Sequence, residues 1–116
     1  MECRQVEIDM PEGYKKGVTV CDDVGFLPPN IKGVTNKRNL ILISRYLHDL
    51  GIPNPKLYVW IHERNHVRHP EKTEYEIREI SDKEYYNRTG IRINTTNDYL
   101  FYEKVHKSFN RRSVFD

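Results

Sequence analysis

The segment at residues 56–66 reads KLYVWIHERNH, and the fold expected for the whole chain depends on whether it is a strand or a helix. Its aliphatic residues recur at every second position, at Leu57, Val59 and Ile61. Such alternation is typical of a strand that buries one face. If the chain turns near Arg68, residues 73–80 form the partner strand and Val59 faces Ile77, an apolar cross-strand pair. We therefore predict a hairpin between residues 56 and 80.

A helix-turn-helix over residues 47–61 is the alternative for the same segment. Asn54 could cap its second helix and Pro55 could be the first residue of that helix. The stretch LGIPNPKLYVWI resembles this DNA-binding motif, and it would present Lys56, Tyr58 and Arg64 to DNA. We prefer the hairpin, because two prolines crowd the turn and the strand pairing would be lost.

Working outward toward the N-terminus, we predict a central helix at residues 36–50. Its apolar residues form one stripe, and Gly51 and Pro53 follow at its end: Leu40, Ile43, Leu47 and Leu50. Residues 22–34 contain two glycines and two prolines and predict a loop.

The first 21 residues predict another hairpin, with strands at 4–9 and 17–21 that turn about Glu12. Paired residue numbers then sum to 24, so Cys3 faces Cys21. Two cysteines are too few for a disulfide-rich scaffold, and we expect reduced thiols. A disulfide, or half of a metal site, is the alternative that this register leaves open.

Toward the C-terminus, Ser81 and Glu84 predict a capping box that opens a short helix, followed by a strand at 91–93 and a helix at 97–110. We expect one α+β domain over residues 1–116, with a hairpin and loop at 1–34 and a helix-hairpin-helix-strand-helix core at 35–116. The sheet is expected to be mostly antiparallel. The order of elements in the core resembles that of double-stranded-RNA-binding domains, as an analogy of architecture alone.

The composition agrees with one folded domain. The chain has 116 residues, 31% of them charged and 11% aromatic, and its mean hydropathy is -0.79. The net charge of +2 favours neither a polyanion nor a membrane surface as partner. There is no long apolar run and no signal-like start, so we expect a soluble, cytoplasmic protein.

One motif in the deciding segment suggests metal chemistry. His62-Glu63-Arg64-Asn65-His66 matches HExxH and resembles the zincin metalloprotease signature, which implies two histidine ligands on a helix and a glutamate that activates water. On a strand, however, His62 and His66 would lie roughly 13 Å apart, too far for one ion. We therefore expect no metal and no cofactor.

The basic residues around the same turn suggest two further functions. Imidazoles at His62, His66 and His69 beside arginines could cleave RNA by general acid–base catalysis without a metal. Binding of a nucleic-acid backbone needs the same basic side chains, but it does not require them to meet at one phosphate. The candidate contacts form two clusters: Arg64, His66, Arg68, His69 and Lys72, and then Lys104, Lys107, Arg111 and Arg112.

Binding to another protein is the function that we rank first. Phe26 and Leu27 lie in a proline-rich loop, and Tyr99 and Tyr102 belong to a tyrosine cluster suited to an interface. The sequence thus favours a non-catalytic accessory or inhibitory protein with a protein partner, and a nucleic-acid-binding domain is the alternative. Homo-oligomerisation stays open.

Overall fold

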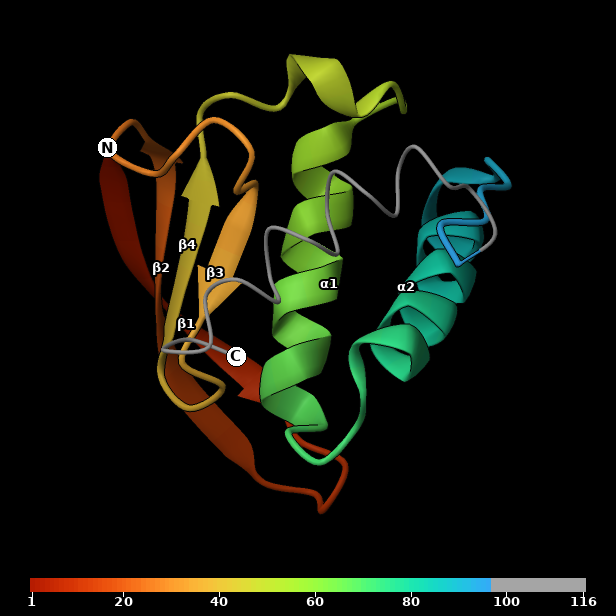
Figure 1. Cartoon of the computed structure of the whole chain (residues 1–116). Coiled ribbons are helices and arrows are strands. Elements are labelled where there is room, and N and C mark those ends of the chain that lie inside the picture. The colour runs from red at the N-terminus through yellow and green to blue at the C-terminus, as the bar shows by residue number, and fades with distance from the viewer. Residues whose placement is uncertain (97–116) are drawn as a thin grey trace.

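The computed structural model describes residues 1–96, which form three layers: a sheet, a helix packed on it, and a second helix packed on the first (Figure 1). The elements are β1 (Glu2–Asp9), β2 (Lys15–Val24), β3 (Gly33–Thr35), β4 (Leu40–Ser44), the short 3-10 helix η1 (His48–Leu50), α1 (Pro55–Arg68) and α2 (Glu74–Thr89). Helix α1 contacts β1, β3 and β4, and α2 packs against α1 on the side away from the sheet.

The sheet is mixed, with strand order β1-β2-β4-β3. The pairs β1/β2 and β3/β4 are antiparallel, whereas β2 and β4 run parallel. The expected α+β class is confirmed, and one parallel pair is added to the expected antiparallel ones. Strand β3 stands at one edge of this sheet, beside α1.

The N-terminal hairpin has the predicted register. Cys3 pairs with Cys21 and Val6 with Val18. The two cysteines form a disulfide between the adjacent strands, with their Cα atoms 4.0 Å apart. The expectation of two reduced thiols is therefore wrong, and the alternative that the register left open is correct.

The helix expected at residues 36–50 is wrong. Asn36 closes a turn instead, because its Oδ1 accepts hydrogen bonds from the backbone N–H groups of Arg38, Asn39 and Leu40. The following run LILIS is β4, an inner strand whose residues Ile41 to Ser44 are all buried. In a strand that is covered on both faces, the apolar residues follow neither the period of two of a half-buried strand nor the stripe of a helix. The apparent stripe came from this continuous apolar run and from η1.

The hairpin expected at residues 56–80 is also wrong, because both segments are helices. Asn54 caps α1 by accepting from the Leu57 N–H, and Pro55 occupies the first turn. Helix α1 is covered by the sheet on one side and by α2 on another, so it has apolar residues on more than one face. Their spacing in the sequence resembles the alternation of apolar and polar residues in a strand. The element before α1 is a single 3-10 turn, which excludes the helix-turn-helix.

Helix α2 begins earlier than the predicted capping box. Thr73 and Glu76 form the capping box, whereas Ser81 is buried inside the helix and accepts a hydrogen bond from Asn65. Residues 91–93 follow Gly90 without regular secondary structure, so the predicted strand is wrong. The predicted helix at 97–110 lies outside the described residues. The order β-β-β-β-α-α up to residue 96 differs from that of the double-stranded-RNA-binding domains.

The main core lies between the sheet and α1. It combines sheet residues with residues of the helix: Val18, Val20, Ile41, Ile43, Tyr58, Val59 and Ile61. A smaller cluster covers the other side of the sheet around Val24, Ile31, Val34 and Leu42. Neither of the α-helices in the described part combines the length and the apolar character that crossing a bilayer requires.

Candidate metal centre

The HExxH motif lies on α1, as its chemistry requires. His62 and His66 are one helical turn apart, and their ring centroids are separated by 5.0 Å. Both side chains are almost completely buried. The objection that a strand would separate the two imidazoles therefore does not apply.

Glu74 completes a three-residue cluster with the two histidines. It is the first residue of α2, and the turn at residues 69–73 reverses the chain so that this end of α2 faces α1. Its carboxylate lies 3.0 Å from His62 Nε2 and 2.8 Å from His66 Nε2. One candidate ligand atom from each of the three residues lies within 4.8 Å of the other two.

The donor set fits a zinc ion. Two imidazole nitrogens and one carboxylate oxygen make up one of the ligand sets of catalytic zinc sites, which keep a further position open for water or substrate. Burial lowers the pKa of His62 to about 4, so its imidazole is neutral and retains a lone pair for a metal. Burial would raise the pKa of Glu74, but its interactions with His62 and then His66 outweigh burial and hold it below the usual range.

Glu63 lies next to this cluster and is completely buried. It faces β3, because a Cβ atom added to Gly33 would lie 3.1 Å from Glu63 Cγ and 2.6 Å from Val59 Cγ1. The missing side chain at Gly33 is what lets the β3 backbone approach α1 so closely. The second residue of the HExxH motif is thus held against the edge strand.

Arg78 supports the cluster from the next turn of α2. Its side chain is completely buried, its Nε donates to Glu74 Oε2 at 3.2 Å, and a terminal nitrogen donates to the Thr95 carbonyl at 3.4 Å. A buried cation beside Glu74 orients that carboxylate and offsets its charge.

A second set of hydrogen bonds anchors the chain after α2. Asp82 accepts from the Thr95 N–H at 2.8 Å, from the Thr95 hydroxyl at 2.9 Å and from the Tyr58 hydroxyl at 3.1 Å. Tyr58 precedes His62 by one turn of α1. Through these contacts the segment at residues 91–96 is tied to both helices close to the candidate metal centre.

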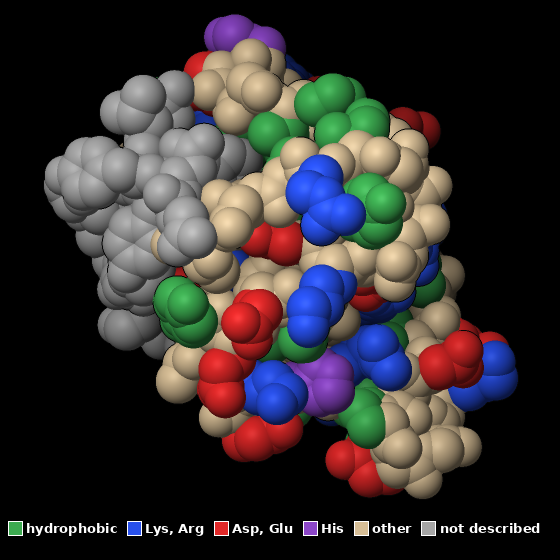
Figure 2. Space-filling model, turned by 90° about the vertical axis from the view of Figure 1, so that its right-hand side faces the viewer, with side chains coloured by type: hydrophobic (Ala, Val, Ile, Leu, Met, Phe, Trp, Pro, Cys, Tyr) green, Lys and Arg blue, Asp and Glu red, His purple; other side chains and the backbone are tan. Residues whose placement is uncertain are grey.

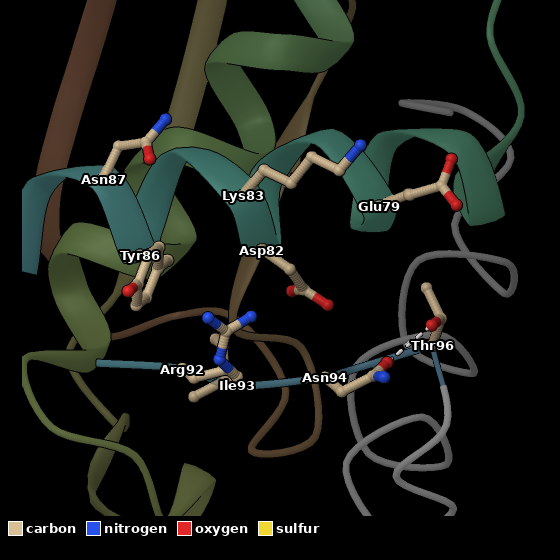
Figure 3. Close-up of a pocket in the computed structure, with 9 residues that line it drawn as sticks. All are labelled: Glu79, Asp82, Lys83, Tyr86, Asn87, Arg92, Ile93, Asn94 and Thr96. Carbon is tan, nitrogen blue, oxygen red and sulfur yellow. Dashed lines mark hydrogen bonds between the residues drawn. The ribbon is translucent and has the colours of Figure 1, made fainter. Parts of the chain in front are cut away.

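Beyond α2 this segment encloses a pocket of about 330 Å³ (Figure 3). Tyr86 and Asp82 of α2 and Arg92 of the segment point toward one another across it, and the Arg92 guanidinium lies 4.5 Å from the centre of the Tyr86 ring. Its remaining charged residues, Glu79 and Lys83, have opposite signs. The pocket therefore favours no single charge of ligand.

Among the described residues, the predicted nucleic-acid contacts do not form one exposed surface. His66 is buried in the metal cluster, Arg64 binds Glu84, and Arg68 donates to the Asp9 carbonyl. His69 and Lys72 are half-buried in the turn between the helices. The second predicted cluster, Lys104, Lys107, Arg111 and Arg112, lies outside the described residues.

On the α2 side, the side chains of residues 1–96 form no separate basic face. Acidic and basic side chains are interspersed over it (Figure 2). Of the predicted protein contacts, Phe26 is 68% exposed, while Leu27 is half-buried against the smaller core cluster. Tyr99 and Tyr102 lie outside the described residues.

Sequence reasoning missed two residues of the centre, Glu74 and Arg78. The signal that could have located Glu74 is the pattern Thr73-x-x-Glu76, which marks a helix start directly before it. Arg78 follows Glu74 by four residues and so lies on the same helix face.

Comparison of the chain with known protein families, with curated proteins and with solved structures finds no match.

Proposed function

We propose that this protein is a zinc-dependent hydrolase that cleaves peptide bonds. The observation that carries the proposal is the convergence of His62, His66 and Glu74 from two helices, with their ligand atoms within 4.8 Å of one another. Glu63 adds a carboxylate directly after the first histidine, at the position of the general base in HExxH sites. Glu74 lies on a different helix from the histidines, so its approach to them depends on the fold and does not follow from the sequence spacing.

Each residue has a defined role in this reaction. When bound, zinc supplies Lewis-acid polarisation of the water and of the scissile carbonyl. His62 and His66 offer imidazole nitrogens, and the ionised Glu74 supplies one negative charge to offset the dication. Glu63 accepts a proton from the attacking water as the C–O bond forms, and returns it to the leaving nitrogen as the C–N bond breaks.

The edge strand supports an extended peptide as substrate. In the described sheet β3 pairs with β4 on one side only, and its backbone runs beside Glu63. An extended peptide can add to such an edge through main-chain hydrogen bonds. That placement would run the peptide alongside β3, whose backbone at Gly33 lies against Glu63.

Zinc content and cleavage activity together test the proposal. We expect about one zinc per chain after metal loading and dialysis, and a loss of at least about tenfold in zinc affinity for Glu74→Gln. Glu63→Gln should bind zinc normally but lose hydrolysis of a mixed peptide library followed by mass spectrometry. His48→Ala, which changes an exposed histidine away from the cluster, is the control. Absence of stoichiometric zinc, or equal cleavage by Glu63→Gln, would contradict it.

Binding of a protein partner is a second candidate function, favoured by the exposure of Phe26. The half-buried Leu27 beside it holds this loop against the core. Cross-linking in a lysate followed by mass spectrometry should lose a specific product in Phe26→Ser but not in Tyr14→Ser, another exposed aromatic residue. Equal loss in both variants would argue against a site at Phe26.

A further inference from the structure

Three arginines line a separate pocket of about 270 Å³. Arg64 and Arg68 come from α1 and Arg88 from the end of α2, while residues 7–9 of β1 close the third side. Arg64 is two positions from each metal-binding histidine, which places it roughly 200° around the helix from them. The pocket therefore lies on the other side of α1 and shares no residue with the candidate metal centre.

Only one carboxylate forms salt bridges with these three arginines in the described structure. Arg64 and Arg88 share one carboxylate, that of Glu84, and each binds a different oxygen of it. Arg68 donates its Nε to the Asp9 backbone carbonyl at 2.8 Å, and within residues 1–96 it forms no salt bridge. Three guanidinium groups thus meet at one pocket with one shared counter-charge bonded to them.

Arg64 shows the cost of this crowding. Its side chain is 12% exposed, and its buried Nε has no hydrogen-bond partner among the described residues. The guanidinium groups of Arg68 and Arg88 line the same pocket, so three like charges repel one another there. An anion in the pocket would satisfy the donor and relieve the repulsion.

Two acidic residues also border the pocket, but they do not fill it. The Asp9 side chain is 81% exposed and pairs with Lys15 at 3.1 Å, so its charge is already balanced at the rim. Glu7 is exposed on the same strand. Neither residue forms a salt bridge with the three arginines in the described structure.

We propose that this pocket binds the phosphate group of a small ligand. Guanidinium groups present paired donors that match two phosphate oxygens at once, and this is how arginine recognises phosphate in proteins. The half-buried Trp60 forms the apolar wall. A volume of about 270 Å³ exceeds that of one phosphate ion and leaves room for an attached organic group against the indole.

The position of Trp60 provides a direct assay, because it is the single tryptophan of the chain. Inorganic phosphate, pyrophosphate and a nucleoside monophosphate are titrated at ionic strength held constant with sodium chloride, and tryptophan fluorescence is recorded. We expect a saturable change for the phosphate compounds. Arg68→Gln and Arg88→Gln should each weaken the affinity about tenfold, the loss expected for one charge-assisted hydrogen bond.

Arg38→Gln is the matched control, since it removes the same charge at an exposed turn far along the chain. It should bind as the unmodified protein does. Glu74→Gln should also bind phosphate normally, which separates this pocket from phosphate bound at a metal ion and makes the result independent of the proposed hydrolase.

Three results would overturn the proposal. The first is the absence of a saturable signal at constant ionic strength, and the second is an equal effect of Arg38→Gln and Arg68→Gln. The third is binding of an RNA oligonucleotide without binding of phosphate, pyrophosphate or the nucleoside monophosphate, which would assign these arginines to a polyanion surface and not to a pocket.

Discussion

The substitution Gly33→Ala tests whether the close approach of β3 to α1 positions Glu63. The added Cβ would lie 2.6 Å from Val59 Cγ1 and 3.1 Å from Glu63 Cγ. Carbon atoms in favourable contact are about 3.5–4.0 Å apart, so the strand and helix must separate by about 1 Å at this point. Overpacking of this size costs about 1–3 kcal/mol.

Thermal unfolding followed by circular dichroism measures this cost. For a domain of this size, we expect the melting temperature to fall by about 4 °C or more for each kcal/mol. Peptide cleavage should fall further than stability alone explains, because Glu63 is one of the two residues displaced. The cleavage rate of each variant is divided by the fraction of protein that is folded at the assay temperature.

Gly17→Ala is the matched control on β2. A Cβ there would meet nothing within 4 Å, and we expect its unfolding free energy to change by less than about 0.5 kcal/mol. If Gly33→Ala were as stable and as active as Gly17→Ala, the packing of β3 against Glu63 described above would be refuted.

Three further predictions concern the framework of the fold. Cys3→Ser should reduce the unfolding free energy by about 3 kcal/mol in denaturant titrations, since the bond closes a loop with a sequence separation of 18; an unchanged midpoint would show that the bond does not form. Thr73→Ala removes the hydrogen bond that the Thr73 hydroxyl accepts from the Glu76 N–H in the α2 capping box and should cost about 1 kcal/mol by the same measurement, whereas Thr96→Ala should have a smaller effect. Arg78→Met leaves the Glu74 carboxylate without its buried cation, so the metal-free protein should lose about 3–5 kcal/mol. Zinc should restore part of that loss, and a variant as stable as the parent without metal would contradict the role given to Arg78.

The N-terminal hairpin was predictable from sequence because its information is local. A short turn fixes the register, and each strand shows one buried face through Val6 and Val18. That register also brought Cys3 opposite Cys21. The α+β class followed in the same way from the mixture of alternating segments and apolar stripes.

The middle of the chain was not predictable in this way, because its elements are buried on more than one side. The run at residues 40–44 is apolar on both faces of an inner strand, and α1 is covered by the sheet and by α2. Under such conditions the period of the apolar residues no longer identifies the element. The stronger signals were the helix starts at Asn54-Pro55 and at Thr73.

The same error decided the functional prediction. The HExxH motif is visible in the sequence, but a strand at residues 56–66 puts its histidines too far apart for one ion. The third ligand, Glu74, depends on how the turn at 69–73 packs α2 on α1, which is tertiary information. Because residues 55–68 form a helix, the function that we propose is a metal-dependent hydrolase and no longer a binding protein.

The location of bound zinc tests the central claim most directly. Crystals of the zinc-loaded protein, measured on both sides of the zinc absorption edge, give the ion's position from its anomalous signal. We expect one strong peak between His62, His66 and Glu74, at about 2.0–2.2 Å from the ligand atoms. A peak at any other site, or the absence of a peak from this cluster in fully loaded protein, would contradict the account.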